Sequence, residues 1–273
     1  MEFSVARQFF YQEIHQTDEQ ICLERAALYL AMEEYPDLDV EAYLNALDVM
    51  ATEVEERLPI EPYPLRILQT INRYLYEDLG FKGNADDYYN PCNSFLNNVI
   101  DQRTGIPITL SLIYLAIAKR VGFPMVGIGM PGHFLIRPNV GEMEIFVDAF
   151  HQGEILFPQD CMDRLAQLFG QPVEIQPAFL QAVTPHQFLA RMLSNLKIIY
   201  LNQGVFQKAL AAIERILLLF PSAPVELRDR GILYYHLNRF AEARQDLEDY
   251  LDLMPAAPDA PIIRNLIEKI MRN

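Results

Sequence analysis

The fold of this chain is decided by residues 103–150, which read RTGIPITLSLIYLAIAKRVGFPMVGIGMPGHFLIRPNVGEMEIFVDAF. Almost every residue from Ile108 to Val121 is apolar, and this pattern predicts a helix that is buried on most sides. Three short apolar segments follow, separated by Pro-Gly and Asn-Val-Gly turns, and they predict adjacent antiparallel strands. The segments are Met125–Met130, Phe134–Arg137 and Glu144–Val147. The stretch therefore predicts a central helix beside a small antiparallel sheet.

The first eighty or so residues show helical periodicity and helix punctuation. Asp18 is expected to cap a helix that ends near Pro36, and Asp39 to cap the next one. A third helix is predicted from Leu65 to Gly80, where glycine favours a stop. After a polar loop at Lys82–Pro91, Asn93 or Ser94 is expected to cap a short helix that reaches Arg103.

An internal repeat with a period of 34 residues begins after residue 184. The matching pairs are Tyr200/Tyr234, Phe206/Phe240, Ala209/Ala243, Glu214/Glu248, Leu217/Leu251, Pro221/Pro255 and Pro224/Pro258. This period, with small, aromatic and proline positions in phase, resembles the tetratricopeptide repeat. Two repeats need further support, so a closing helix is expected at Pro261–Met271.

These patterns predict an α+β chain in three parts. Residues 1–90 form a helical N-terminal region, 91–183 a core with a small antiparallel sheet, and 184–273 an all-α repeat region. The segment Glu154–Val183 is less defined by its sequence. A helix at Gln159–Phe169 and extended chain around Pro172 and Pro177 are expected there.

Composition restricts the class of protein. The net charge of −15 argues against affinity for nucleic-acid phosphates, because such binding depends on cationic side chains. Nine carboxylates and no lysine or arginine lie between Glu33 and Glu56. This run is expected to form either a solvated helix face or a surface for a basic partner. The three cysteines form no CxxC pair, so neither a disulfide framework nor a thiolate zinc site is expected. With no signal-peptide pattern and no membrane-length apolar run, a cytoplasmic protein is predicted.

Two residues of the central stretch have the chemistry of a cysteine-enzyme active site. His133 opens the second predicted strand, and Asp148 ends the third. Papain-like sites combine a thiol at the start of a buried helix with a histidine from an adjacent strand and an aspartate that orients it. Here the buried helix begins near Pro107, and no cysteine stands at its start.

Four sequence blocks resemble the SirB-type transglutaminase-like proteins with C-terminal tetratricopeptide repeats. The blocks are Asn93-Ser94-Phe95-Leu96-Asn97, Gly105-Ile106-Pro107-Ile108-Thr109-Leu110-Ser111-Leu112, Pro131-Gly132-His133-Phe134-Leu135 and Val147-Asp148-Ala149-Phe150. The resemblance covers nearly the whole chain and implies a papain/transglutaminase-like core in which His133 and Asp148 match the catalytic dyad. In active members a cysteine lies one helix length before a Gly-x-Pro segment. Counting back from Gly122 reaches Pro107, which suits a helix start but cannot be a nucleophile.

Four other residues are candidates for the nucleophile. Cys92 precedes a helix start, whereas the hydroxyls of Ser94, Thr109 and Ser111 are harder to activate than a thiol and fit caps or core hydrogen bonds. His133 also has a structural alternative, as a buried histidine that pins two strands through Asp148. Among the other histidines (His15, His151, His186 and His236), which lack metal-ligand spacing with one another, His151 is a candidate for the same cleft. Neither a metal, a cofactor nor a phosphate loop is predicted.

Two functions are therefore weighed. The first is a non-catalytic pseudoenzyme that binds a protein or peptide through its repeats and acts as an interaction or regulatory module. The alternative is a hydrolase or acyl transferase that uses the His133–Asp148 dyad with an unorthodox nucleophile or water. The sequence indicates neither the partner nor the oligomeric state.

Overall fold

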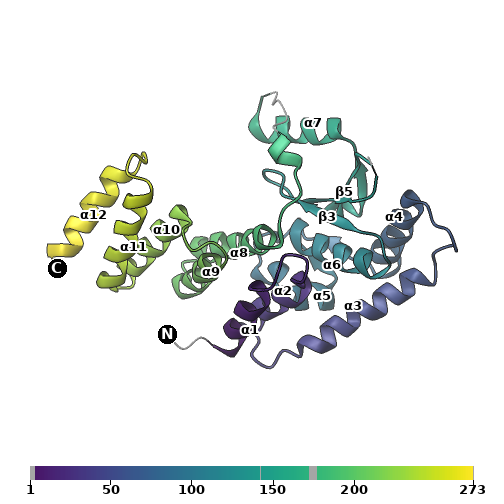
Figure 1. Ribbon diagram of the computed structural model, residues 1–273, viewed down its shortest axis with the longest axis horizontal. Helices are drawn as coiled ribbons and strands as arrows, with labels where there is room; N and C mark the ends of the chain where they lie inside the picture. The colour runs from purple at the N-terminus through teal and green to yellow at the C-terminus, as the bar shows by residue number, and fades with distance from the viewer. Residues whose placement is uncertain (1–3, 142, 172–176, 273) are drawn as a thin grey trace. The chain divides into compact units, whose positions relative to one another are not determined.

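The computed structural model describes residues 4–141, 143–171 and 177–272, and the chain divides into two compact units, residues 1–192 and 193–273 (Figure 1). The first unit contains helices and two small sheets, and the second is helical, as the α+β prediction requires. The predicted boundary at residue 183 lies just before α8 (Pro185–Asn202), a helix that runs through the division between the units. The three-part division stays a prediction.

Helices form the N-terminal part of the first unit, as predicted. They are α1 (Val5–Ile14), α2 (Leu23–Ala31), α3 (Val40–Glu55), α4 (Pro64–Asn72), the π-helix η1 (Arg73–Asp78), the 3-10 helix η2 (Pro91–Ser94) and α5 (Leu96–Gln102). Asp39 caps α3 by accepting a hydrogen bond from the backbone N–H of Ala42 at 3.1 Å. Gly80 stops the third predicted helix with a φ of +73°. The Asp18 cap was wrong, because residues 18–20 form a turn and α2 begins only at Leu23.

The expected cap at Asn93 or Ser94 was also wrong, because the N-cap of α5 is Phe95. The Asn93 side chain is buried and donates hydrogen bonds to the carbonyl oxygens of Asp87 and Tyr88, at 2.7 and 3.2 Å. Its backbone carbonyl accepts the Thr109 hydroxyl at 2.7 Å. Asn93 therefore ties the polar loop to the central helix and does not cap α5.

The central helix α6 (Pro107–Arg120) is buried on most sides, as its apolar sequence predicts. It packs against α3 and against the strands β3 and β4. At its start, the backbone N–H of Ile106 donates to the Thr109 hydroxyl at 3.1 Å. Arg120, in its last turn, pairs with Glu24 at 2.7 Å. The helix is thus fixed at both ends by residues outside its own apolar surface.

The four-stranded sheet is antiparallel in the order β3-β4-β5-β6. Its strands are β3 (Met125–Ile128), β4 (Leu135–Pro138), β5 (Phe146–Asp148) and β6 (Glu154–Leu156). The first three match the predicted segments, and β6 was not predicted. A second, parallel sheet consists of the two-residue strands β1 (Lys82–Gly83) and β2 (Thr104–Gly105).

A helix predicted at 159–169 covers one face of the larger sheet. This helix, α7 (Pro158–Phe169), contributes Cys161 and Leu165 to an apolar cluster with Leu135 and Phe146 (Figure 1). Because strand residues alternate between faces, Asp148 projects to the same side as Phe146. The extended chain expected around Pro172 lies outside the described residues, whereas Pro177 begins a short 3-10 helix, η4 (Pro177–Leu180).

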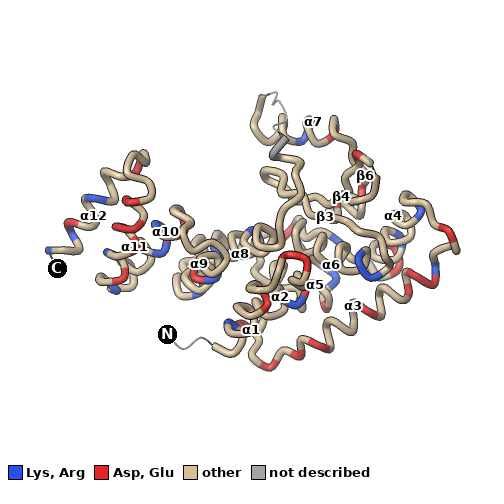
Figure 2. Tube along the Cα trace, viewed as in Figure 1, with Lys and Arg blue, Asp and Glu red and all other residues tan. Residues whose placement is uncertain are grey.

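The second unit contains the predicted repeats. Helices α9 (Phe206–Leu219) and α11 (Phe240–Leu253) have bounds displaced by the 34-residue period, α10 (Pro224–His236) lies between them in sequence, and α12 (Ala260–Arg272) is the closing helix. Gly231 lets α10 and α11 approach, because a Cβ there would lie 2.8 Å from Leu247 Cγ. Basic and acidic residues both occur along the helices of this unit (Figure 2). Among them, the buried ammonium of Lys197 pairs with Glu226 at 2.8 Å.

Candidate functional site

His133 is held at the start of β4 by a tight turn. Its backbone N–H donates to the carbonyl oxygen of Met130 at 3.1 Å. Gly132, immediately before it, has a φ of +72°, and a Cβ there would lie 2.6 Å from a Leu168 methyl group. Glycine is therefore required both by the backbone conformation and by the close approach of α7.

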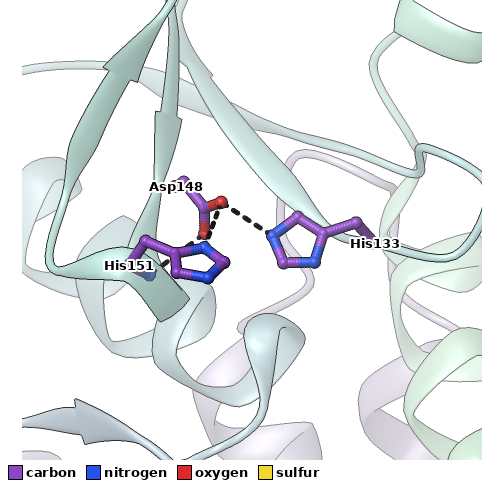
Figure 3. A group of neighbouring side chains, drawn as sticks. All are labelled: His133, Asp148 and His151. Atoms are coloured by element: carbon purple, nitrogen blue, oxygen red, sulfur yellow. Dashed lines mark hydrogen bonds and ion pairs between the residues drawn. The ribbon is translucent and has the colours of Figure 1, made fainter. Parts of the chain in front are cut away.

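Asp148, at the end of β5, is fully buried and is the centre of the site. Its Oδ1 accepts the backbone N–H groups of Phe150 and His151, at 3.1 and 3.3 Å, and so caps the 3-10 helix η3 (Ala149–His151). Its Oδ2 lies 2.9 Å from His133 Nε2 and 2.8 Å from His151 Nδ1, with both rings directed at it (Figure 3). The backbone thus fixes one carboxylate oxygen and leaves the other to side chains.

A fourth side chain, Arg164 of α7, also binds Oδ2 of Asp148 through Nη1. Its Nη2 donates to Glu154 at 2.6 Å, on the strand next to β5. Arg164 therefore joins α7 to two neighbouring strands and places a permanent positive charge beside Asp148.

The Asp148 carboxylate is held in its ionised form. Burial raises its pKa, but the hydrogen bonds from His133, His151 and Arg164 outweigh burial, and the pKa is well below its ordinary value. An ionised carboxylate only accepts hydrogen bonds, so His133 Nε2 and His151 Nδ1 both carry a proton toward it. This leaves Nδ1 of His133 and Nε2 of His151 as the ring nitrogens of the site that can accept a proton.

The two histidines border a pocket of about 390 Å³. It is lined by Met130, Pro131, Gly132, His133, His151, Arg164, Gln167 and Leu168. The His133 side chain is 17% exposed and that of His151 is 54% exposed. The cleft at His133 is thus open to solvent, and His151 lines it as the sequence had suggested.

The other candidate nucleophiles have different surroundings. Pro107 is the first residue of α6, and the Thr109 hydroxyl is engaged with Ile106 and Asn93. Ser94 and Ser111 are buried, and their hydroxyls have no hydrogen-bond partner within the part of the chain that is described. These three hydroxyls belong to the core at the start of α6.

Cys92 interacts with the Tyr35 hydroxyl, and no hydrogen bond between described residues joins its thiol to His133. Burial raises the pKa of the other two thiols, Cys22 and Cys161, to about 11. A thiol must ionise to attack, so neither of these two has the environment of an activated nucleophile.

Sequence reasoning missed several neighbours of the His133–Asp148 pair. Arg164 belongs to a helix that was predicted, but nothing in its spacing points to Asp148. The Phe150 ring centroid lies 6.2 Å from that of His133 in an edge-on arrangement. Tyr76, on η1, has a buried hydroxyl without a partner among the described residues, and burial followed by the Asp148 charge raises its pKa. Its helical position gave no signal of this electrostatic interaction with Asp148.

Comparison with known proteins places the two units in families. The profile of the transglutaminase-like superfamily matches residues 41–194, and that of the tetratricopeptide repeat matches 196–268. A UPF0162 protein of Xylella fastidiosa (strain 9a5c) is 37% identical over 254 residues, which cover 90% of this chain and 89% of that protein. The predicted family resemblance is thereby confirmed.

More distant similarities exist. F-box only protein 21 of Mus musculus is 34% identical over 188 residues, or 65% of this chain and 29% of that protein. A crystal structure of menin, described as revealing the binding site for Mixed Lineage Leukemia (MLL) protein, aligns with a TM-score of 0.43 and 12% identity over 90% of this chain and 68% of that one. Among the described residues, no helix is long and apolar enough to cross a membrane. The chain belongs to the transglutaminase-like superfamily and, within it, to the UPF0162 proteins, with tetratricopeptide repeats after the core.

Proposed function

We propose that this chain is a protein-interaction module in which the transglutaminase-like core is non-catalytic and the repeats bind a protein or peptide partner. Tetratricopeptide repeats generally mediate protein–protein interaction, which supports the second part of this proposal. We place the protein in the cytoplasm, where a reducing environment suits its three unpaired cysteines.

The observation that carries the proposal is Pro107 at the first position of the buried helix α6. A thiol at this position would be activated by the helix N-terminus and by a histidine base. Proline supplies neither a nucleophile nor a backbone N–H. The core therefore keeps the shape of an acyl-transfer enzyme without the atom that would form its covalent intermediate.

Arg164 is a second argument against catalysis. The aspartate of a catalytic histidine must stabilise the imidazolium that forms when the histidine takes a proton. Asp148 already shares Oδ2 with the Arg164 guanidinium. Part of its negative charge is thus balanced before His133 becomes charged, so the carboxylate gives less support to a general base.

The alternative function is a hydrolase or acyl transferase that uses the His133–Asp148 dyad. The 2.9 Å contact between the two side chains and the pocket beside His133 favour it. In this mechanism Nδ1 of His133 would take a proton from water or from an unorthodox nucleophile. This candidate remains second because no hydrogen bond between described residues joins such a nucleophile to His133.

Turnover assays separate the two functions. The full chain and its His133→Ala variant would be assayed with fluorogenic amides, esters and a glutamine-containing peptide with an amine acceptor. We expect equal background rates for both proteins. Turnover by the wild-type chain that disappears in His133→Ala would refute the non-catalytic proposal and establish the alternative.

The proposal that the repeats bind a partner needs a separate test. Ile262 on α12 is 69% exposed, and Ile60, in the first unit, is 102% exposed. A partner found by crosslinking to the full chain would be purified and titrated with Ile262→Glu and, as a matched control, Ile60→Glu. We expect weaker binding by the first variant alone. Equal affinities for both variants, with crosslinks confined to the first unit, would contradict binding through the repeats.

A further inference from the structure

We propose that His133, Asp148 and His151 bind a divalent transition-metal ion, because their ligand atoms converge at the edge of a solvent-accessible pocket. One ligand atom from each residue lies within 4.8 Å of the other two. Two imidazoles and one carboxylate form a common ligand set for zinc and for non-haem iron. This site is independent of the proposed interaction function.

The separations between the candidate ligand atoms around Asp148 Oδ2 approach those between the ligand atoms of a bound metal ion. Ligand atoms about 2.0–2.2 Å from zinc, at tetrahedral or octahedral angles, are separated by about 3–3.5 Å. The contacts of Oδ2 with His133 Nε2 and His151 Nδ1, at 2.9 and 2.8 Å, are close to this separation. For an ion to bind, each neutral imidazole must carry its single proton on the other ring nitrogen, Nδ1 of His133 and Nε2 of His151, so that lone pairs replace the two hydrogen bonds to Oδ2. Small rotations of the two imidazoles, both directed at Asp148 in Figure 3, would then complete the site.

The surroundings favour binding in two further ways. Oδ1 of Asp148 is held by the backbone N–H groups of Phe150 and His151, which orients Oδ2 toward the histidines. Such outer contacts position metal ligands and strengthen binding. The pocket of about 390 Å³ leaves room for water or a small ligand at the remaining coordination positions.

Arg164 is expected to oppose metal binding. Its guanidinium binds the same carboxylate oxygen, so it competes with an incoming cation for that oxygen and repels the cation's charge. Glu154, 2.6 Å from Arg164 Nη2, provides a second anchor to which the guanidinium can turn when the ion binds. Removing the Arg164 charge should therefore tighten metal binding, whereas removing a ligand should weaken it.

The experiment is a zinc titration of the chelator-treated full chain against a chromophoric zinc indicator, followed by cobalt absorbance as a report on coordination. Four proteins are compared: wild type, His151→Gln, Arg164→Gln and, as a control outside the cluster, His15→Gln. Circular dichroism checks that each variant is folded. His151 is the ligand chosen for substitution because its side chain is 54% exposed.

We expect one zinc ion per chain, at least about 100-fold weaker binding by His151→Gln, and about tenfold tighter binding by Arg164→Gln. His15→Gln should bind as the wild type does. The proposal is overturned if the wild type binds no zinc, or if folded His151→Gln retains the wild-type affinity. It is also overturned if Arg164→Gln weakens binding, since the guanidinium would then support the occupied state.

Discussion

Thr109 is the residue at which the structural account of the α6 start can be tested most directly. Its buried hydroxyl accepts the backbone N–H of Ile106 at 3.1 Å and donates to the carbonyl oxygen of Asn93 at 2.7 Å. Thr109→Val removes both hydrogen bonds and keeps the side-chain shape. The substitution therefore isolates the polar contacts that hold the loop to the central helix.

The expected cost follows from the two groups left without partners. A buried donor or acceptor that loses its partner costs about 1–3 kcal/mol. The Ile106 N–H and the Asn93 carbonyl together should lower the free energy of unfolding by about 3 kcal/mol. With a urea m-value of about 2–3 kcal/mol/M for a unit of this size, the midpoint should fall by about 1 M.

Urea unfolding would be followed by circular dichroism, because the chain has no tryptophan. Two substitutions serve as controls. Thr109→Ser keeps the hydroxyl and should cost about 1 kcal/mol through its lost methyl group. Ser111→Ala removes a buried hydroxyl that has no partner among the described residues, so it should be neutral or stabilising. If Thr109→Val is no less stable than Thr109→Ser, the two hydrogen bonds do not stabilise this junction.

Three further predictions concern packing and charge. Because burial raises the pKa of Cys161 from 9.0 to about 11, the thiol of the unfolded chain ionises first, and the free energy of unfolding falls as pH rises from about 9 to 11. Unfolding measured at several pH values should show a smaller fall for Cys161→Ala than for the wild type, and parallel curves would contradict this explanation. Gly231→Ala places a Cβ against Leu247 and should cost about 1–3 kcal/mol in thermal unfolding of the repeats, so an unchanged midpoint would count against close packing there. Lys197→Met leaves Glu226 without its buried partner and should lower the free energy of unfolding by about 3–5 kcal/mol. The double variant Lys197→Met/Glu226→Leu should recover most of this stability. Equal losses of stability in the two variants would refute the ion-pair explanation.

The elements predicted with most success are those whose sequence pattern is local and regular. The 34-residue period predicts α9 and α11 in register, and the apolar run predicts α6 to within a residue at each end. Asp39 was identified correctly because its cap is satisfied within the first turn of α3. In these elements, local preference and tertiary packing favour the same structure.

The failures lie where a polar side chain has a better partner elsewhere in the fold. Asn93 and Ser94 have the chemistry of caps, but the fold buries both, and the Asn93 amide binds Asp87 across the loop. The strand β6 was missed because three residues carry too little pattern, and it forms through its pairing with β5. The π-helix η1 likewise has no distinct sequence signal, although it brings Tyr76 toward Asp148.

The candidate site was only half predictable for the same reason. His133 and Asp148 came from a family pattern, and the fold brings them within 2.9 Å, but the pattern carries no information about Arg164. Arg164 changes the functional interpretation of the His133–Asp148 pair. An aspartate bound only to a histidine would argue for a general base, whereas Asp148 also caps η3 and binds α7 through Arg164. These contacts give Asp148 a structural role in joining β5 to its neighbours, so its presence beside His133 does not by itself require catalysis.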